Sequence, residues 1–514
     1  MRGQVTGSKL LITLIAMGGA LMAFIDISIV NVALSDMRAS FGTPLDQIGW
    51  VSTGYMMANI VVIPMTGWFQ RRFGFRKYFA WSVLMFTVAS ALCGLAWNLP
   101  SLVLFRVLQG LGGGAIIPTA QSLLFARYPK AEHGTAAGLF GLGAVTGPLL
   151  GPTIGGYLTS WLSWHWIFLV NVPLGLLVAY FAAKVIEEPD FVAPKEPVDV
   201  YGIVLLATGM PALQYVLEEG NREGWGESRT IIALAIVAVL ALVTFIVHEL
   251  ETPNPIVDLR VFKNRTYAGG TVVNFLTGLA LFGSTYLFSL FCGAVMHYTA
   301  LDIGRVFLAA GALQLFLMPF VGRIAPKVDS RGLLLFGVVV VAGSQLVASH
   351  LTGVAGFGDL VQPQLIRAIG LSFVFIPASM LALSDLDGAQ RGNATGLFNL
   401  TRELGGSIGT AWMGMVVTDG IKSHGSALAS HVTAYDPLVQ EQLRTMAATI
   451  GPRTPTGSIL PEALLQLRVA GQALVLSFED GFRLAAIVML LGVLAVAVMK
   501  RPRPQAPGAA SGAH

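Results

Sequence analysis

The sequence predicts an all-α polytopic membrane protein with fourteen transmembrane helices, and three observations support this. Hydrophobic residues make up 54% of the 514 residues and charged residues only 12%, whereas soluble proteins usually have about 25% charged residues. Apolar stretches of about 20 residues, the length that crosses a hydrocarbon core of about 30 Å, recur along the chain. Lys and Arg residues are concentrated between alternate stretches, which is typical of membrane topology signals.

The fourteen predicted helices follow one another from near the N-terminus to residue 499. Arg2 and Lys9 precede the first apolar run, which is too long for a cleaved signal peptide and has no small-residue cleavage site after it. We therefore expect an uncleaved first span. The expected helices centre near residues 22, 57, 88, 113, 147, 176, 209, 240, 279, 314, 342, 374, 405 and 488.

The distribution of basic residues predicts the orientation of these helices. An even number of spans puts both termini on one side of the membrane. If that side is the cytoplasm, the short outer loops carry only Arg38, Arg222 and Arg229, and most other basic residues are internal. We therefore expect both termini in the cytoplasm. The pI near 9.0 then reflects topology, and no nucleic-acid partner is expected.

Two sets of similar segments indicate an internal repeat. GWFQRRFGFRKYF begins at Gly67 and GRIAPKVDSRGLL at Gly322, an offset of 322 − 67 = 255 residues. Arg106 in LFRVLQGLGGGAIIP corresponds to Arg367 in LIRAIGLSFVFIP, an offset of 367 − 106 = 261 residues. Parallel repeats place a substrate site near the midplane between two halves. The predicted organisation is a six-helix bundle at 10–186, a linker with two extra helices at 187–266, a second six-helix bundle at 267–499 and a tail at 500–514.

One predicted outer segment, residues 419–477, is long. It contains YDPLVQEQLRTMAATIG and PEALLQLRVAGQALVL, which both resemble amphipathic helices that begin at Pro or Asp-Pro. Three interpretations stay open for it: a flexible loop, a docking surface for an extracytoplasmic partner, and a helical cap.

Seven stretches together resemble one known family: DISIVNVAL, GWFQRRFGFRK, RVLQGLGGG, GPLLGPTIGG, WIFLVNVPLG, NPIVDLRVF and TRELGGSIGT. The chain is similar over nearly its whole length to the fourteen-span drug–proton antiporters of the major facilitator superfamily, the EmrB/QacA subfamily. The resemblance implies the major facilitator fold, with two extra central helices between its two six-helix bundles. It also implies location in the bacterial inner membrane and export of drugs or other small amphipathic compounds by alternating access.

The same resemblance sets expectations for cofactors and partners. The proton motive force would drive transport, with no cofactor and no enzymatic activity. The expected partners are a small lipophilic substrate, protons and membrane lipids. A periplasmic adaptor protein and an outer-membrane channel stay open as further partners. Proton-coupled uptake on the same fold is the alternative within transport, and a membrane-embedded enzyme or an assembly component is the alternative outside it.

Glycines spaced four residues apart form a ridge along the fifth predicted helix, which allows close approach of a neighbouring helix. The stretch resembles the antiporter motif GPxxGPxxGG, which implies a role in shaping the outward gate; by spacing alone, simple packing is also open. The prolines of the stretch would bend the helix so that another helix rocks against it. The motif residues are Gly143, Gly147, Pro148, Gly151, Pro152, Gly155 and Gly156.

The loop after the second predicted helix resembles the cytoplasmic loop motif of the superfamily. The superfamily usually has an acidic residue at the fifth motif position, where this chain has Arg71. The salt-bridge latch that depends on this acid is therefore not expected here. The motif residues are Gly67, Arg71, Arg72, Gly74, Arg76 and Lys77.

Charged residues within predicted spans are the candidates for proton coupling, because burying them in a bilayer is costly. Asp26 lies in the first span and begins the DxxxxN pattern that ends at Asn31. A desolvated carboxylate can hold a proton and release it when an Arg approaches. Arg106, which shares a helix face with Gln109, is the expected switch. A purely structural role for both charges stays open.

Charges and aromatic residues of the second half are further candidates. Arg402 and Glu403 are adjacent and therefore expected on different faces, with Glu403 a second proton carrier or a site for cationic substrates and Arg402 in support. Arg367 is expected to be interfacial or structural. Phe282, Tyr286 and Phe398 are candidates for the substrate cavity, although aromatic residues in membrane helices often only pack.

Several patterns argue against other functions. GLGGGA, from Gly110 to Ala115, matches a dinucleotide-binding fingerprint but lies in a predicted membrane helix without a βαβ unit. The sequence has no GxxxxGK[ST] stretch, and its His residues lack metal-ligand spacing, so neither a nucleotide site nor a metal site is expected.

Overall fold

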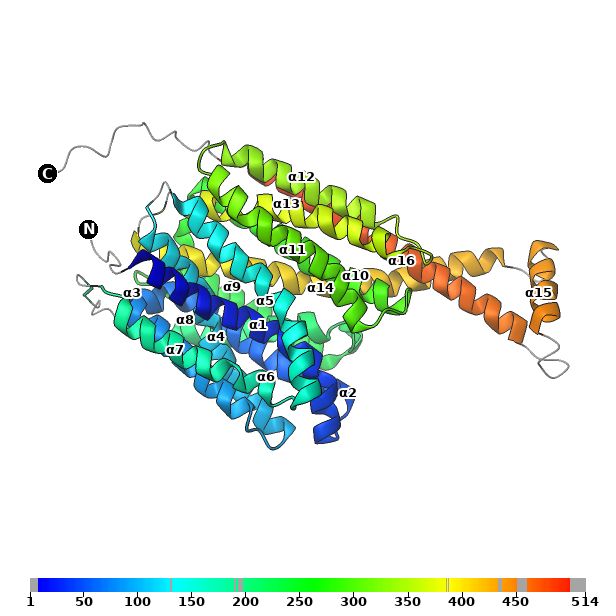
Figure 1. Ribbon diagram of the computed structural model, residues 1–514, viewed down its shortest axis with the longest axis horizontal. Coiled ribbons are helices and arrows are strands. Elements are labelled where there is room, and N and C mark those ends of the chain that lie inside the picture. The colour runs from blue at the N-terminus through cyan, green and yellow to red at the C-terminus, as the bar shows by residue number, and fades with distance from the viewer. Residues whose placement is uncertain are drawn as a thin grey trace.

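The computed structural model describes residues 8–129, 132–188, 191–192, 197–384, 386, 388–432, 437–450 and 460–499, and most of these are helical (Figure 1). The helices are α1 Lys9–Phe41, α2 Leu45–Ile48, α3 Trp50–Cys93, α4 Leu99–Arg127, α5 His133–Trp161, α6 Trp166–Leu169, α7 Asn171–Val185, α8 Val200–Glu219, η2 Trp225–Glu227, α9 Arg229–Glu251, η3 Leu259–Lys263, α10 Arg265–Ala294, α11 Ala300–Ile324, α12 Ser330–Ala348, α13 Phe357–Ser384, α14 Gly388–His431, α15 Pro437–Ile450 and α16 Leu460–Val498.

Each of the fourteen predicted span centres lies on one of these helices. Eleven helical segments among the described residues are long and apolar enough to cross a membrane. The remaining three predicted centres fall on α3, which contains those near residues 57 and 88, and on α14, which contains the one near 405.

Gly74 divides α3 into its two predicted spans. Its φ of 79° and ψ of 161° lie in a region that is essentially reserved for glycine. The turn is held by Glu188, which follows α7: its carboxylate accepts hydrogen bonds from the amides of Phe75 at 3.0 Å and Arg76 at 2.9 Å. An acid from elsewhere in the chain thus stabilises the loop whose own motif carries Arg71 in place of an acid.

Replacement of Gly74 by Ala is expected to destabilise the protein by about 1–3 kcal/mol, the usual cost of a residue forced into this backbone region. A Cβ at residue 74 would also lie 2.8 Å from Glu188 Oε2. The midpoint of thermal unfolding in detergent should fall accordingly. Gly332→Ala is the control, since a Cβ there meets nothing within 4 Å; equal midpoints for the two variants would contradict the prediction.

The helices form two groups joined by a central pair. Helices α1, α3, α4, α5 and α7 pack on one another as the first bundle, and α10 to α14 with α16 pack as the second. Helices α8 and α9 of the predicted linker pack together, and α8 contacts both α3 and α14. The first residues of α1 and the last residues of α16 lie at the same end of the molecule (Figure 1), which is called the terminal face below. The predicted tail, 500–514, lies outside the described residues.

The predicted outer segment forms an arm that projects from the end opposite the terminal face (Figure 1). The arm comprises the described residues of 419–477: the end of α14, all of α15 and the start of α16. The stretch PEALLQLRVAGQALVL is helical, as predicted, and it is continuous with the last span in the 39-residue α16. No proline follows Pro461 in that helix to interrupt it.

Candidate functional site

Asp26 and Arg106 form a buried ion pair inside the first bundle. Arg106 Nη1 lies 2.7 Å from Asp26 Oδ2, and the arginine and the aspartate are 1% and 0% exposed. Asp26 lies 26 − 9 = 17 residues into the 33-residue α1, which places it about halfway along the helix. The sequence-based expectation that Arg106 lies beside Asp26 therefore matches the geometry.

Amide groups complete the hydrogen bonding of the carboxylate. Gln109 Nε2 donates to Asp26 Oδ1 at 2.8 Å, and Asn171 Nδ2 donates to the same oxygen at 3.0 Å. Both amides also donate to Ser90 Oγ, each at 3.2 Å. Charge-assisted hydrogen bonds of this kind stabilise the ionised form of a buried carboxylate.

Arg106 has contacts that do not depend on Asp26. Its Nε donates to the backbone oxygen of Val51 at 3.0 Å, and its Nη1 donates to Gln109 Oε1 at 2.7 Å. Its guanidinium lies over the ring of Tyr55, 4.2 Å from the ring centroid. The arginine is therefore held in place by α3 and by Gln109 of its own helix, independently of Asp26.

Residues around the pair differ from the prediction in two respects. Asn31, the end of the DxxxxN pattern, is exposed, and its Oδ1 accepts from Ser52 at 3.3 Å, so it does not contact Asp26. Five residues along a helix correspond to a rotation of about 140°, which turns Asn31 away. Asn171 and Ser90 were not predicted as site residues; the only signal was that Asn171 belongs to the conspicuous stretch WIFLVNVPLG.

The glycine ridge of α5 packs against α1, one turn from the ion pair. A Cβ at Gly147 would collide with Phe24, and a Cβ at Gly151 with Ser28. At Gly155 it would lie 2.8 Å from Ile29 Cγ1, and at Gly143 it would lie 3.1 Å from Met17 Cε. Ser28 Oγ donates to the backbone oxygen of Gly147 at 3.2 Å.

The ridge therefore faces α1, a neighbouring helix of its own bundle. The glycines that face the second bundle lie on the earlier turns of α5. Helix α5 remains one helix through Pro148 and Pro152. A Cβ at Gly156 would meet nothing within 4 Å, and the side chain of Pro148 lies outside the described residues.

Other glycines bring the two bundles together near the terminal face. Gly134 of α5 and Gly322 of α11 are in backbone contact: a Cβ at Gly322 would lie 2.8 Å from the oxygen of Gly134. One turn further along α5, a Cβ at Gly138 would lie 3.2 Å from the oxygen of Met318. These α5 glycines were not predicted to be interface residues, because they precede the motif.

Helix α3 contacts the second bundle equally closely. Gly67 of the loop motif lies against the backbone of Asn393 in α14. Asn393 is also hydrogen bonded to Asp258, by Nδ2 to the Asp258 oxygen at 2.8 Å and by Oδ1 to its amide at 3.0 Å. These contacts and the Gly134–Gly322 contact are called the terminal seal below.

The remaining loop-motif residues lie around the seal. Arg71 Nη2 donates to the oxygen of Pro255 at 3.4 Å, so it holds the segment that carries Asp258. Arg72 is half-buried, and Arg76 and Lys77 are exposed. The turn of this loop is held by Glu188, which lies after α7.

Arg402 and Glu403 lie just inside the seal. Arg402 Nη2 lies 3.3 Å from Glu403 Oε1 and 3.4 Å from Asn399 Oδ1. The two residues are adjacent on α14, and the ends of their long side chains nevertheless meet as an ion pair. Asn399 Nδ2 in turn donates to Gln121 Oε1 of the first bundle at 2.7 Å.

The three aromatic candidates for the cavity do not share one described pocket. Phe398 is buried beside a closed space of about 10 Å³ between the bundles, which Asn399 and Arg402 also line. Phe282 and Tyr286 on α10 are 38% and 40% exposed. Arg367, which was predicted to be interfacial or structural, is 7% exposed, as the structural alternative requires.

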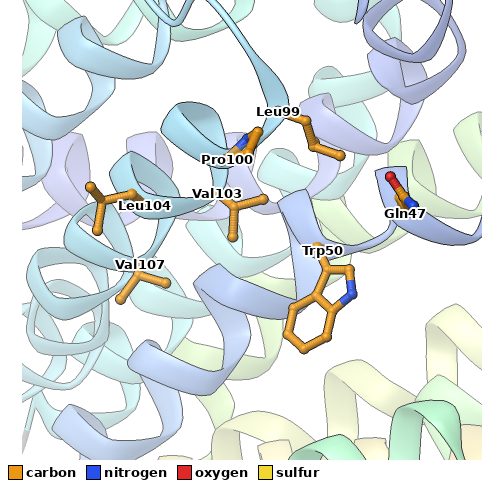
Figure 2. Close-up of a pocket in the computed structure, with 7 residues that line it drawn as sticks. All are labelled: Gln47, Trp50, Leu99, Pro100, Val103, Leu104 and Val107. Carbon is orange, nitrogen blue, oxygen red and sulfur yellow. The ribbon is translucent and has the colours of Figure 1, made fainter. Parts of the chain in front are cut away.

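A pocket of about 540 Å³ lies at the other end of the first bundle. Figure 2 shows it between Trp50, at the start of α3, and the first turns of α4. Its lining is almost wholly apolar: Gln47, Trp50, Leu99, Pro100, Val103, Leu104 and Val107. Leu104 is also exposed on the outer surface of α4, so the pocket is a groove on the flank of the bundle, distinct from the ion pair.

Comparison with known proteins assigns the fold to a family. The family model described as Major Facilitator Superfamily matches residues 16–410, most of the chain. The chain belongs to the major facilitator superfamily. The predicted fold class is thereby confirmed, and the protein is a multi-pass membrane transporter of this superfamily.

Similar proteins extend over nearly the whole chain. The multidrug export protein EmrB of Haemophilus influenzae is 32% identical over 501 residues, which cover 96% of this chain and 96% of that protein. The fatty acid resistance protein FarB of Neisseria gonorrhoeae is 34% identical over 420 residues, 82% of this chain and 83% of that protein. The structure of the human organic anion transporter MFSD10 (TETRAN) covers 96% of this chain and 100% of its own, with a TM-score of 0.63 at 11% identity; this likeness concerns the fold alone.

Proposed function

We propose that the protein is a proton-coupled antiporter of the bacterial inner membrane that exports drugs or other small amphipathic compounds by alternating access. The observation that carries this proposal is the buried Asp26–Arg106 pair within a bundle of a transporter fold. The names of the relatives, multidrug export protein EmrB above all, support export of drugs as the direction and substrate class. The energy source is the proton gradient, and no cofactor is required.

Asp26 carries the proton in this mechanism. With the carboxylate ionised, Arg106, Gln109 and Asn171 all donate to it and α1 is tied to α4 and α7. When Asp26 takes up a proton, its charge vanishes and the ion pair is lost, while Arg106 keeps its bonds to Val51 and Gln109. The link between α1 and α4 therefore weakens on protonation, and α1 is free to shift against the glycine ridge of α5.

The terminal seal indicates the side of the membrane to which the transporter is open in this arrangement. The positive-inside distribution assigns the terminal face to the cytoplasm, so the sealed arrangement is the outward-facing state. A proton reaches Asp26 from the outer side in this state. Protonation favours opening of the seal, and the proton then leaves to the cytoplasm while the compound enters the transporter from that side.

The proton gradient is large enough for this work. One charge that moves through about 100 mV supplies roughly 2.3 kcal/mol. Because each tenfold concentration ratio requires about 1.4 kcal/mol, one net charge supports roughly a 50-fold gradient of the exported compound.

The arm supports a periplasmic adaptor protein as a partner, with an outer-membrane channel beyond it. A 39-residue helix is about 58 Å long, and the bilayer core accounts for about 30 Å of it. The arm therefore stands well clear of the membrane and offers the residues of 419–477 to a partner on the outer side.

Reconstitution in liposomes tests the proposal. The purified protein is placed in vesicles with a pH-sensitive dye and an imposed proton gradient, and lipophilic cations, weak acids and neutral amphiphiles are then added in turn. Proton movement that depends on one of these compounds, in the direction opposite to it, is the expected result. Movement of a compound and protons in the same direction would instead establish symport, and compound movement without protons would establish a uniporter.

Replacement of Gly322 by Val is expected to reduce export at least tenfold. The added side chain lies against the oxygen of Gly134 and prevents closure of the terminal seal, so the outward-facing state is depopulated. The compound that responds in the liposome assay is the substrate for this measurement. Gly304→Val is the matched control on the same helix, since a Cβ at Gly304 meets nothing within 4 Å. Equal export by both variants would remove the seal from the mechanism.

A further inference from the structure

The second bundle contains a buried arginine in surroundings that resemble those of Arg106. Arg367 on α13 donates through Nη1 to Ser284 Oγ at 3.2 Å and to Thr285 Oγ1 at 3.1 Å, both on α10. Its guanidinium lies over the ring of Phe307 on α11, 5.6 Å from the centroid. Neither the fold nor the proposed proton coupling accounts for this cation.

The internal repeat shows which residue stands beside Arg367 in place of the carboxylate that pairs with Arg106. Arg367 is the counterpart of Arg106, and Ser284 follows Asp26 by 284 − 26 = 258 residues, within the 255–261 offsets of the repeat. The contacts agree with this register, because Arg106 bonds Asp26 and Arg367 bonds Ser284. An amide donor also points to each of the two positions: Gln109 to Asp26, and Gln345 Nε2 to Ser284 Oγ at 3.3 Å.

The second bundle thus has a buried arginine and an amide donor, as the first does, but has a hydroxyl where the first has a carboxylate. The ion pairs that the structure describes include Arg106 but not Arg367. A guanidinium stays protonated in proteins, and a buried charge without a counter-charge is costly unless something supplies one. The buried guanidinium of Arg367 therefore requires one negative charge to balance its own.

We propose that Arg367, Ser284, Thr285 and Gln345, the Arg367 site, bind one monovalent anion: the carboxylate of a transported compound or a chloride ion. The guanidinium of Arg367 and the amide of Gln345 both donate to Ser284 Oγ, whose own proton is donated to the oxygen of Leu281 at 3.3 Å. Guanidinium and amide groups that converge in this way bind carboxylates through hydrogen bonds, and the guanidinium adds charge assistance. In the carboxylate case this inference rests on the proposed export function and narrows its substrate class to amphipathic acids.

The site has a side from which an anion can approach. Thr285 is half-buried, and its neighbour Tyr286 is 40% exposed, so the guanidinium lies one side chain away from accessible surface. Phe282, one turn earlier on α10, is 38% exposed. These two aromatic rings offer an apolar surface to the hydrocarbon part of a compound whose carboxylate faces Thr285 and Arg367.

Equilibrium binding to the purified full-length protein in a chloride-free, nonionic detergent buffer tests the site. The midpoint of thermal unfolding is followed during titration with octanoate, with its neutral analogue octanamide, and with chloride. Octanoate or chloride is expected to raise the midpoint in a saturable manner, because a ligand that binds the folded state stabilises it. Octanamide is expected to have no saturable effect at the same concentrations.

Two matched variants make the test specific to the missing charge. Ser284→Asp supplies the counter-charge in the register of Asp26 and is expected to weaken anion binding at least about tenfold. Ser284→Asn has nearly the same size without the charge and is expected to bind within about threefold of the unmodified protein. Because Ser284→Asp completes an ion pair with Arg367, it should fold at least as well as Ser284→Asn, and its midpoint without ligand measures this directly.

The possible results distinguish a carboxylate site from a chloride site, and two of them would overturn the proposal. Saturable stabilisation by octanoate that the Ser284→Asp change weakens identifies a carboxylate site, and the same behaviour with chloride alone identifies an inorganic anion. The proposal is overturned if neither anion stabilises the unmodified protein, or if Ser284→Asp and Ser284→Asn bind equally. The measurement involves no proton gradient, so a failure of proton coupling in liposomes leaves it unaffected.

Discussion

Asp26→Asn is expected to reduce compound-dependent proton movement in liposomes to the level of empty vesicles. The amide has the size of the carboxylate but cannot release or take up a proton, so the step on which coupling depends is lost. The buried Arg106 then has no counter-charge, although its bonds to Val51 and Gln109 remain. The measurement is the change in dye signal after addition of the responsive compound, together with the amount of compound exported.

A control for this variant is Asp36→Asn, which neutralises an exposed acid on the same helix. Its proton movement should equal that of the unmodified protein. Both variants should elute as single species of the same size after purification. Normal coupled export by Asp26→Asn would show that the proton is carried elsewhere, and Glu403 would become the next candidate because it too is paired with an arginine.

Arg106→Ala is expected to be more damaging than Arg106→Lys. Removal of one partner from a buried ion pair typically costs about 3–5 kcal/mol, since the other charge is left unpaired. Lysine restores the charge but not the planar fork that reaches Asp26, Gln109 and the oxygen of Val51 together. Export should therefore fall in the order unmodified protein, Lys variant, Ala variant, and the midpoint of thermal unfolding should fall in the same order.

A double variant provides the control for Arg106. Asp26→Asn combined with Arg106→Ala removes both charges, so it should be more stable than Arg106→Ala alone, while its coupled export stays absent. This pattern attributes the instability to the unpaired carboxylate rather than to the lost volume of arginine. Equal export by the unmodified, Lys and Ala proteins would exclude Arg106 from the mechanism.

Most of the fold was predictable because spans, topology and repeats depend on local composition. A run of about 20 apolar residues must form a helix in lipid, where every backbone polar group has to be hydrogen bonded internally. The pairing of Asp26 with Arg106 was also predictable in outline, because few charges occur in the spans and each needs a partner. The predicted proton-coupling roles remain predictions that the variants above test.

Features that depend on three-dimensional packing could not be predicted. Asn171 and Ser90 are neutral and common, so nothing in their local sequence showed that both contact the ion pair. Gly134 and Gly322 form a close contact only because α5 and α11 cross at those turns. The side-chain path by which Arg402 reaches Glu403 depends on rotamers that residue spacing does not determine.

Helix α14 is a single helix of 44 residues, about 66 Å long, with Asn393 near one end and the arm at the other. A helix that tilts as a rigid rod about a point within the membrane moves its two ends in opposite directions. A sideways displacement of the arm would therefore be returned at Asn393, where α14 lies against Gly67. The arm and the terminal seal are in this sense coupled through the two ends of one continuous helix.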